Sequence, residues 1–393
     1  MKDNKLHTPD GFKDTLPRPF LLKKKLQNNI ENTFYLTGYS PISSPLLEYA
    51  EVFEGAGSVP PRQMYRLIGR DGDILALRSD MTPPAARIAA TNYTQSGVPL
   101  RFYYTENAFR CHQSYKGKAG EYTESGVELI GAAGIEADAE VIALAVDCLL
   151  AAGLTGFRLY IGHAGFIRGA LGECDLSEDD KRVILRSMSS HKIATAEGLV
   201  VNARMPSGVK ELTGRLNMLT GDLKLLDWAA ALVNNESSAH AIRILKNIRT
   251  ALDDYGLSEY ILFDLGMIGT LDYYTGVVFR AYAKGTGFSL LDGGRYDELI
   301  KRYGQDFPAV GFSLKLDNLA ALLDGAGEPV NSDAYIAYTS PGRKEAQQKA
   351  RELRARGVRA EISLEPDKPR EYYEAEANKR GIPDVYYFGG GGV

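Results

Sequence analysis

Strand-like segments joined by tight turns recur through the first 320 residues, and this pattern constrains the fold more than any other feature. Tyr65–Arg78 carries the turn Arg70-Asp71-Gly72-Asp73 between two strand-like runs, which is typical of a β-hairpin. Further strand-like runs are Leu100–Phe109, Glu124–Ala132, Phe157–Gly162, Tyr260–Phe263, Tyr274–Ala283 and Gly287–Asp292. Hairpin connections predict an antiparallel sheet in an α+β fold rather than a parallel sheet built from βαβ units.

Helical patterns divide the chain further. Leu21–Leu36 and Ala137–Ala152 have the apolar spacing of helices that flank a sheet, and residues 176–255 are mostly helical, which predicts an insertion. Residues 323–332 are rich in Gly, Pro and polar side chains and are expected to be a linker. We therefore predict a main domain over residues 1–322 and a small α/β domain over residues 333–393.

Composition narrows the possible partners. The 46 basic and 50 acidic residues give a net charge of −4, so a nucleic-acid partner would need a local basic patch. Cys111, Cys148 and Cys174 form no CxxC pair, which predicts reduced thiols and no metal site. The most apolar helical stretch, Val141–Leu154, is shorter than the roughly 20 residues that a bilayer requires. We expect a cytoplasmic protein that needs no cofactor.

An acidic strand is the first candidate site. Side chains alternate along a strand, so Glu124, Gly126 and Glu128 share one face. If that face is enclosed, a cation between the two carboxylates would relieve their repulsion, and the glycine would leave room above an acidic floor. The pattern fits a solvent-facing strand with exposed glutamates at least as well.

Two further segments carry polar or aromatic candidates. Asp80 and Thr82 follow a strand and can cap the next helix, or they can also accept hydrogen bonds from a ligand ammonium. Tyr273 and Tyr274 can be ordinary sheet packing. The sequence Gly293-Gly294-Arg295-Tyr296 can be a tight turn or a place where backbone approaches a ligand.

Taken together, these segments resemble the histidyl-tRNA synthetase family of class II aminoacyl-tRNA synthetases. The resemblance covers roughly residues 8–322. Its motifs are Gly38-Tyr39 through Glu48 (motif 1), Phe109-Arg110, Lys116-Gly117-Lys118 and Gly126-Val127-Glu128 (motif 2), Pro308–Phe312 through Leu319 (motif 3), and the histidine-specific segments Leu271–Tyr274 and Gly293–Asp297.

The resemblance implies a class II sheet with flanking helices and a pocket for free histidine. The positions that it assigns to histidine binding are Asp80, Thr82, Arg110, Glu124, Glu128, Tyr273, Tyr274 and Tyr296. Glu124 stands where the family usually has glutamine. For Arg110 we expect a contact with the histidine carboxylate.

The resemblance also shows what is missing. Forming an aminoacyl-adenylate requires fixed cations around a triphosphate. Where the family has an arginine in motif 3 this sequence has Asn318, and where it has a histidine-specific arginine this sequence has Gly269. His112 replaces the glutamate that reads adenine. Synthetase chemistry is therefore expected to be lost, while the amino-acid pocket is kept.

Within this family the chain resembles the ATP phosphoribosyltransferase regulatory subunits. That resemblance implies no catalysis by the chain itself, dimerisation through the class II interface, and a hetero-oligomer, expected to be a hetero-octamer, with a short-form catalytic subunit that histidine inhibits. We expect no tRNA and no membrane partner. An active histidyl-tRNA synthetase, a histidine sensor with another partner and a scaffold with an empty pocket are the alternatives.

Overall fold

The computed structural model describes residues 4–55, 59–94, 97, 99–112, 119–189, 198–199, 203–215, 218–267, 273–323 and 331–389. The chain forms two compact units. The larger comprises Met1–Asp14 and Lys23–Asp324, and the smaller comprises Thr15–Leu22 and Gly325–Val393. None of the described helices is long and apolar enough to cross a lipid bilayer.

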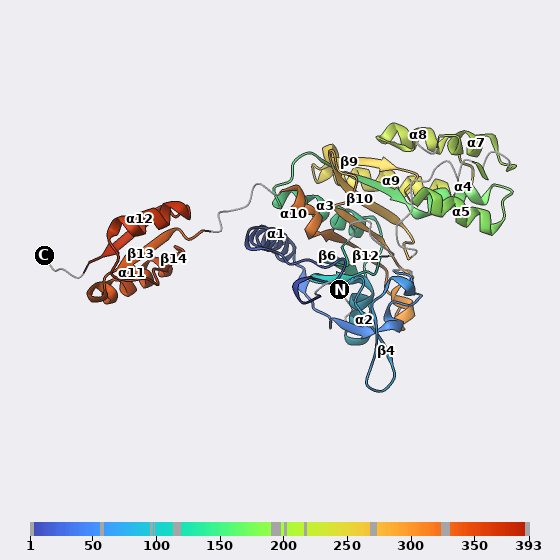
Figure 1. The fold of residues 1–393 in the computed structure, drawn as a ribbon. Helices are drawn as coiled ribbons and strands as arrows, with labels where there is room; N and C mark the ends of the chain where they lie inside the picture. The colour runs from blue at the N-terminus through green and yellow to red at the C-terminus, as the bar shows by residue number, and fades with distance from the viewer. Residues whose placement is uncertain are drawn as a thin grey trace. The chain divides into compact units, whose positions relative to one another are not determined.

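A mixed, mainly antiparallel sheet organises the larger unit (Figure 1). Among the described residues it has nine strands in the order β1-β5-β6-β12-β11-β10-β7-β9-β8. Their bounds are β1 Ser40–Pro41, β5 Leu100–Phe109, β6 Glu121–Ile130, β7 Phe157–His163, β8 Thr220–Gly221, β9 Ile261–Asp264, β10 Val277–Ala283, β11 Leu291–Arg295 and β12 Ala309–Lys315. Only the β1–β5 and β7–β9 pairs are parallel in this sheet. The predicted antiparallel α+β architecture is confirmed.

Helices flank the sheet. α3 (Ile135–Ala151) packs against β6, β11 and β12, and Figure 1 shows it beside the central strands. α9 (Glu236–Asp254) packs against α3, β7 and α4 (Ala164–Gly172). The remaining described α-helices of this region are α1 Pro17–Leu36, α2 Thr82–Asn92, α5 Glu178–Ser189, α7 Ser207–Thr213, α8 Leu223–Ala230 and α10 Leu316–Leu322. The stretch expected to be helical therefore contains α5, α7, α8 and α9, and also contributes β8 to the sheet.

A small second sheet of the larger unit contains the hairpin that the turn sequence predicts. β3 (Arg66–Ile68) and β4 (Ile74–Leu77) pair antiparallel, and β2 (Leu47–Tyr49) pairs with the other edge of β4. Gly72 in the connection has a φ of 91°, a backbone conformation that glycine adopts without strain.

The smaller unit is a three-layer α/β module. Its parallel sheet has the order β14-β13-β15, with β13 Ala334–Tyr338, β14 Ala360–Ile362 and β15 Asp384–Phe388. α11 (Arg343–Ala355) packs with one face of β13 and α12 (Arg370–Lys379) with the other, because alternate residues of β13 enter two separate apolar clusters. The predicted α/β character of this part of the chain is confirmed.

Several expectations need correction or lie outside the described residues. Gly293 and Gly294 belong to β11, so they form no tight turn. Lys116-Gly117-Lys118, Gly269–Asp272 and most of the expected linker, residues 324–330, are outside the described part of the chain.

Candidate functional site

A cavity of about 730 Å³ lies in the larger unit, over the central strands of the nine-stranded sheet. The structure brings all of the candidate site residues of the sequence to its wall. These are Asp80, Thr82, Arg110, Glu124, Glu128, Tyr273, Tyr274 and Tyr296. They come from β6, from the segments that follow β4, β5 and β11, and from the segment that precedes β10.

Glycines on neighbouring strands make room for the side chains of this cavity. In the sheet register Gly311 of β12 lies opposite both Glu128 of β6 and Gly294 of β11. A Cβ at Gly311 would overlap the Glu128 carboxylate, and one at Gly294 would overlap the Tyr274 ring. A glycine pair on adjacent strands therefore lets an acid and an aromatic ring lie flat against the sheet.

Gly126 plays a different part from the one expected. Instead of leaving free room above an acidic floor, it makes space for the Tyr104 hydroxyl, which a Cβ at Gly126 would overlap. Tyr104 donates a hydrogen bond of 3.3 Å to Glu128 Oε1. The glycine between the two glutamates thus positions a hydrogen-bond donor for one of them.

Glu128 is fully enclosed, with 1% of its surface exposed. Its Oε2 accepts a hydrogen bond from the Tyr296 hydroxyl. Burial raises the pKa of Glu128 to about 8, although hydrogen bonds from Tyr296, Thr82 and Tyr104 oppose the rise. A ligand cation beside this carboxyl would favour its charged form.

Glu124 is also buried, with 5% exposed, so the exposed-glutamate alternative is wrong for both positions. Burial and the neighbouring Asp80 raise the pKa of Glu124 to about 8, while Arg110 and Lys315 oppose the rise. Its Oε2 atom is buried without a hydrogen-bond partner. Because Glu124 lines the cavity, a ligand donor that reached this oxygen would supply the hydrogen bond that it lacks.

Asp80 lies two residues before the start of α2, and each of its carboxylate oxygens has a protein partner. Its Oδ1 accepts the backbone N–H of Thr82 at 3.0 Å, which satisfies a free donor at the helix start. Its Oδ2 accepts a hydrogen bond from Tyr273 at 3.4 Å on the cavity side. Thr82 is the first residue of α2 rather than a capping residue, and its side chain is directed to Glu128.

Arg110 supplies positive charge on this side of the cavity. Its guanidinium lies 5.6 Å from the centre of the Tyr122 ring and donates to the Ser79 carbonyl at 3.3 Å. Burial alone would lower the pKa of Arg110, but Tyr122, Glu124 and Asp80 raise it above its ordinary value. Arg110 therefore stays charged.

Three tyrosines form an aromatic wall beside the acids. The ring centres of Tyr273 and Tyr274 are 4.9 Å apart and those of Tyr273 and Tyr296 are 5.7 Å apart, with edge-to-face geometry in both pairs. All three are buried. The Tyr273 and Tyr296 hydroxyls donate to Asp80 and Glu128, so the aromatic wall is joined directly to the buried acids.

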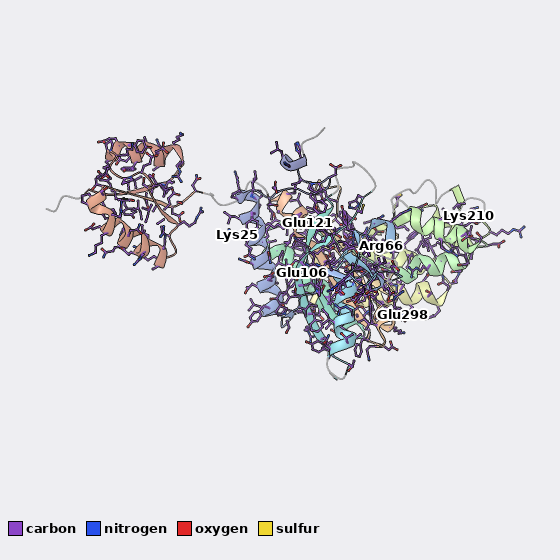
Figure 2. All side chains as sticks on the ribbon, turned by 60° about the horizontal axis from the view of Figure 1, so that its bottom comes forward. Lys25, Arg66, Glu106, Glu121, Lys210 and Glu298 are labelled. Atoms are coloured by element: carbon purple, nitrogen blue, oxygen red, sulfur yellow. The ribbon has the colours of Figure 1, made fainter. Side chains whose placement is uncertain are left out.

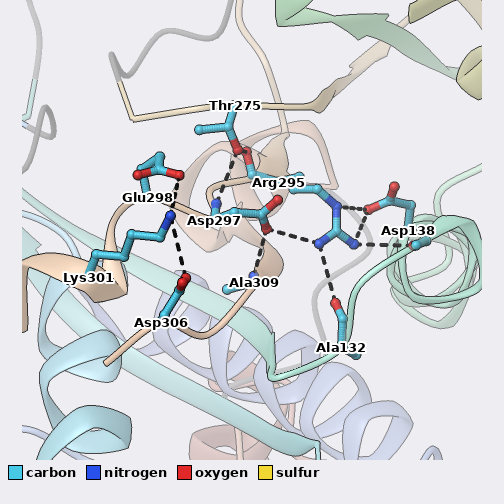
Figure 3. Close-up of polar contacts among 10 residues, drawn as sticks. Ala132, Asp138, Thr275, Arg295, Asp297, Glu298, Lys301, Asp306 and Ala309 are labelled. Atoms are coloured by element: carbon cyan, nitrogen blue, oxygen red, sulfur yellow. Dashed lines mark hydrogen bonds and ion pairs between the residues drawn. The ribbon is translucent and has the colours of Figure 1, made fainter. Parts of the chain in front are cut away.

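A buried ion pair on the opposite face of the sheet anchors the strand that leads to Tyr296. Arg295 binds Asp138 of α3 at 2.7 Å and Asp297 at 3.0 Å, and its guanidinium also reaches the Ala132 carbonyl at 3.3 Å (Figure 3). Because side chains alternate along a strand, fixing Arg295 against α3 directs Tyr296 into the cavity.

The far side of the cavity carries charged residues that sequence reasoning missed. Arg280 binds Asp292 at 2.6 Å, Lys315 is ion-paired with the same carboxylate, and Ser289 donates to it at 2.9 Å. These charges hold the pKa of Asp292 at about 2, against the effect of burial. Arg280 and Asp292 are opposite each other in the β10–β11 register, so only a correctly aligned hairpin would have revealed them.

Two of the positions that differ from the synthetase pattern, Asn318 and His112, also line the cavity. Asn318 donates to the Ser289 carbonyl at 3.1 Å, so an amide held by the backbone stands at that position. Across the described ranges, no group of three or more His, Cys, Asp or Glu side chains could hold a metal ion. The cavity thus combines buried acids and tyrosines at one end with paired charges at the other.

Comparisons with known proteins agree with this geometry. A family model described as histidyl-tRNA synthetase matches residues 11–319. The chain is 36% identical to the ATP phosphoribosyltransferase regulatory subunit of Acetivibrio thermocellus, covering 93% of this chain and 88% of the relative. It is 33% identical to the protein of the same name in Clostridium kluyveri, covering 95% and 97%.

Solved structures give the same result. A Bacillus halodurans C structure described as an ATP phosphoribosyltransferase regulatory subunit/histidyl-tRNA synthetase superposes with a TM-score of 0.88 at 32% identity, covering 98% of this chain and 99% of that one. Histidyl-tRNA synthetase from Nostoc sp. PCC 7120 shares the fold with a TM-score of 0.79 at 21% identity, covering 96% and 90%. The chain belongs to the ATP phosphoribosyltransferase regulatory subunit family, whose members have the histidyl-tRNA synthetase fold.

Proposed function

We propose that this chain is the non-catalytic regulatory subunit that a short-form ATP phosphoribosyltransferase requires for activity, and that it carries feedback inhibition by histidine. Its place among the regulatory subunits gives it a regulatory role in histidine biosynthesis. The observation that carries the finer proposal is the pocket in which buried acids lie beside an aromatic wall.

The chemistry of free histidine fits this pocket. The α-ammonium would lie among the carboxyl groups of Asp80, Glu124 and Glu128, which are buried and border one cavity. The imidazole ring would pack against the wall of Tyr273, Tyr274 and Tyr296, where hydroxyls and carboxyls can serve both ring nitrogens. Histidine that binds one arrangement of the complex more tightly than another would shift the complex toward that arrangement, and the coupling is reciprocal.

Arg110 would hold the histidine carboxylate. The arginine stays charged and lines the same wall as the acids. A bidentate pair with a carboxylate is among the stronger polar contacts in a protein. Replacing Arg110 with alanine should weaken histidine binding at least tenfold, and an unchanged affinity would refute this role.

The other end of the cavity supports the proposed loss of synthetase chemistry. Asn318 offers no charge, and Arg280 and Lys315 are both held by Asp292. Loss of one preorganised donor costs roughly 10²–10³ in rate. A pocket arranged in this way binds an amino acid without activating it.

Assembly is the second part of the proposal. Leu47, Tyr49 and Leu67 of the small sheet are exposed and share one face, because Tyr49 and Leu67 both lie opposite Leu75 of β4. This apolar face suits a homodimer through the class II-type interface. Two such faces would bring two chains together, and catalytic subunits would complete a hetero-oligomer, with a hetero-octamer as the proposed form. The mixed charges of the small α/β unit speak against tRNA binding.

Mixing this chain with the short-form catalytic subunit from the same source tests the proposal. A stable complex should appear by light scattering, and phosphoribosyl-ATP formation should require the chain. If the chain neither binds nor accelerates the catalytic subunit, the regulatory proposal fails. Histidine-dependent pyrophosphate exchange by the chain alone would instead favour the synthetase.

A further inference from the structure

The acidic end of the cavity brings three buried carboxyl groups together. Asp80, Glu124 and Glu128 all line it, each with 5% or less of its surface exposed. Arg110 is a cation of the same wall. Charges that are buried in a protein must be balanced or neutralised by protonation, since leaving them unbalanced costs several kcal/mol each.

The environment of Glu124 shows why the protonation of this carboxyl group can change when a ligand binds. Asp80 faces it from the start of α2 and disfavours its charge, while Arg110, which follows β5, favours it. From its own strand Tyr122 lies near, but the Tyr122 hydroxyl donates to the Ser79 carbonyl at 3.1 Å and not to Glu124. Glu128 is already held by two tyrosine hydroxyls.

The charged residues that lie opposite Glu124 on the neighbouring strands are ion-paired with other residues. Lys315 lies opposite Glu124 on β12, but its ammonium is ion-paired with Asp292 of β11. Glu106 lies opposite on β5 and is ion-paired with Arg78 at 2.5 Å. Glu124 therefore lacks a dedicated cation among its described neighbours.

A second, independent observation points to a ligand. Of the described Asp80, Glu124 and Glu128 oxygens, only Glu124 Oε2 is buried without a hydrogen-bond partner. The atom belongs to a residue that lines the cavity and is more than nine-tenths buried. A native buried acceptor without a donor indicates a missing partner.

We propose that Glu124 makes this site charge-selective: the carboxyl group gives up a proton to solvent when a cationic amine binds beside it, so the cavity takes amines and rejects ligands in which a neutral group replaces the amine. This inference rests on the proposed histidine site and states which ligands that site would accept. With the proton on Glu124 the empty cavity avoids an unbalanced charge, and with the amine bound the carboxylate is balanced again. The positive charge is exchanged rather than added.

The test uses the full chain, L-histidine and imidazole lactate, in which a hydroxyl replaces the ammonium. Calorimetric titration near pH 7 in two buffers of different ionisation enthalpy gives the number of protons that each ligand releases. Histidine should release roughly half a proton to one proton, and imidazole lactate should release none and bind at least about 100-fold more weakly, the cost of losing a charged hydrogen-bond pair in a buried site.

Two variants separate the role of Glu124 from that of another glutamate on the same strand. In Glu124→Gln the side chain keeps its shape but cannot ionise, so proton release should fall and the preference for histidine should shrink about tenfold. Glu121→Gln is the matched control on the same strand (Figure 2), since Glu121 does not line the cavity and accepts its hydrogen bond from Asn107 at 2.8 Å. This control should match the wild type in both measurements.

The outcomes distinguish the two proposals. Histidine binding without proton release, together with an unchanged preference in Glu124→Gln, overturns the inference and leaves the histidine site intact. Absence of histidine binding by the wild type overturns both. Should Glu124→Gln fail to fold, the proton count and the preference of the wild type still decide, because a count of zero with equal affinity for both ligands contradicts the proposal.

Discussion

Gly311 lies directly opposite Glu128 in the β12–β6 register, and the Glu128 carboxylate occupies the space that a side chain at Gly311 would need. A residue with no side chain on one strand thus fixes the position of a buried acid on the next. This relationship ties the motif 3 segment to the motif 2 segment of the fold, which are about 180 residues apart in the sequence.

Substitution of Gly311 by alanine should therefore harm both stability and binding. The new Cβ would overlap the Glu128 carboxylate and the Val127 carbonyl, which cannot both move without breaking the sheet register. We expect a loss of about 1–3 kcal/mol in the free energy of unfolding, measured by urea denaturation. Gly287 is the control, since it also lines the cavity but a Cβ there meets nothing within 4 Å. Equal behaviour of the two alanine variants would contradict this account of Gly311.

Removing the Tyr296 hydroxyl should weaken histidine binding. The hydroxyl donates to Glu128 Oε2 and helps this carboxyl to hold its charge despite burial. Because a hydrogen bond to a charged group is worth about 1.5–3 kcal/mol, Tyr296→Phe should raise the Kd for histidine roughly tenfold or more by calorimetry. Tyr282→Phe serves as control, because Tyr282 lines the far side of the same cavity and contacts only Arg280, at 3.5 Å, in its described hydrogen bonds.

The sequence was informative where periodicity or local chemistry decides the structure. Strand alternation placed Glu124 and Glu128 on one face, and the hairpin turn at Gly72 was recognisable from its residues. Alternation could not show that the face is enclosed, since burial depends on segments distant in sequence. For the same reason Gly126 was misread, because the Tyr104 hydroxyl that fills its space comes from the neighbouring strand.

Residues whose role depends on register escaped prediction altogether. Arg280, Asp292 and Lys315 are separated in sequence and meet only when β10, β11 and β12 pair in one alignment. The pair Gly293-Gly294 suggested a turn, because two consecutive glycines are more common in turns than in strands. In the fold they lie within β11 and accommodate the aromatic side chains of Phe279 and Tyr274.

Stability of the empty protein should fall as the pH rises toward 8. Burial raises the pKa of Glu124 and Glu128 from 4.5 to about 8, so between these values the folded protein holds protons that the unfolded chain has released. The contribution is therefore complete below the unfolded value and is lost as the pH passes the folded one, by up to about 1.4 kcal/mol per pH unit and group. Urea denaturation at pH 5 to 9 should show a shallower decline for Glu124→Gln than for the wild type. Parallel curves would contradict the buried, protonated state of Glu124.

The Arg295–Asp138 pair should matter far more than exposed ion pairs nearby. Replacing Arg295 with methionine leaves Asp138 buried without its cation, which typically costs 3–5 kcal/mol in the free energy of unfolding. Lys301→Met removes the exposed pair with Glu298 seen in the same region (Figure 3) and should leave the unfolding midpoint unchanged. If both variants unfold at the wild-type midpoint, the anchoring role of Arg295 is wrong.

The most direct test of the regulatory account is a histidine titration of the reconstituted complex. Phosphoribosyl-ATP formation by the short-form catalytic subunit from the same source would be followed with wild-type chain and with Tyr296→Phe. The account predicts a rate that depends on the chain, that falls with histidine, and whose half-inhibition moves to at least about tenfold higher histidine in the variant. The account would be contradicted if wild type and Tyr296→Phe were inhibited at the same histidine concentration, or if the rate did not depend on the chain.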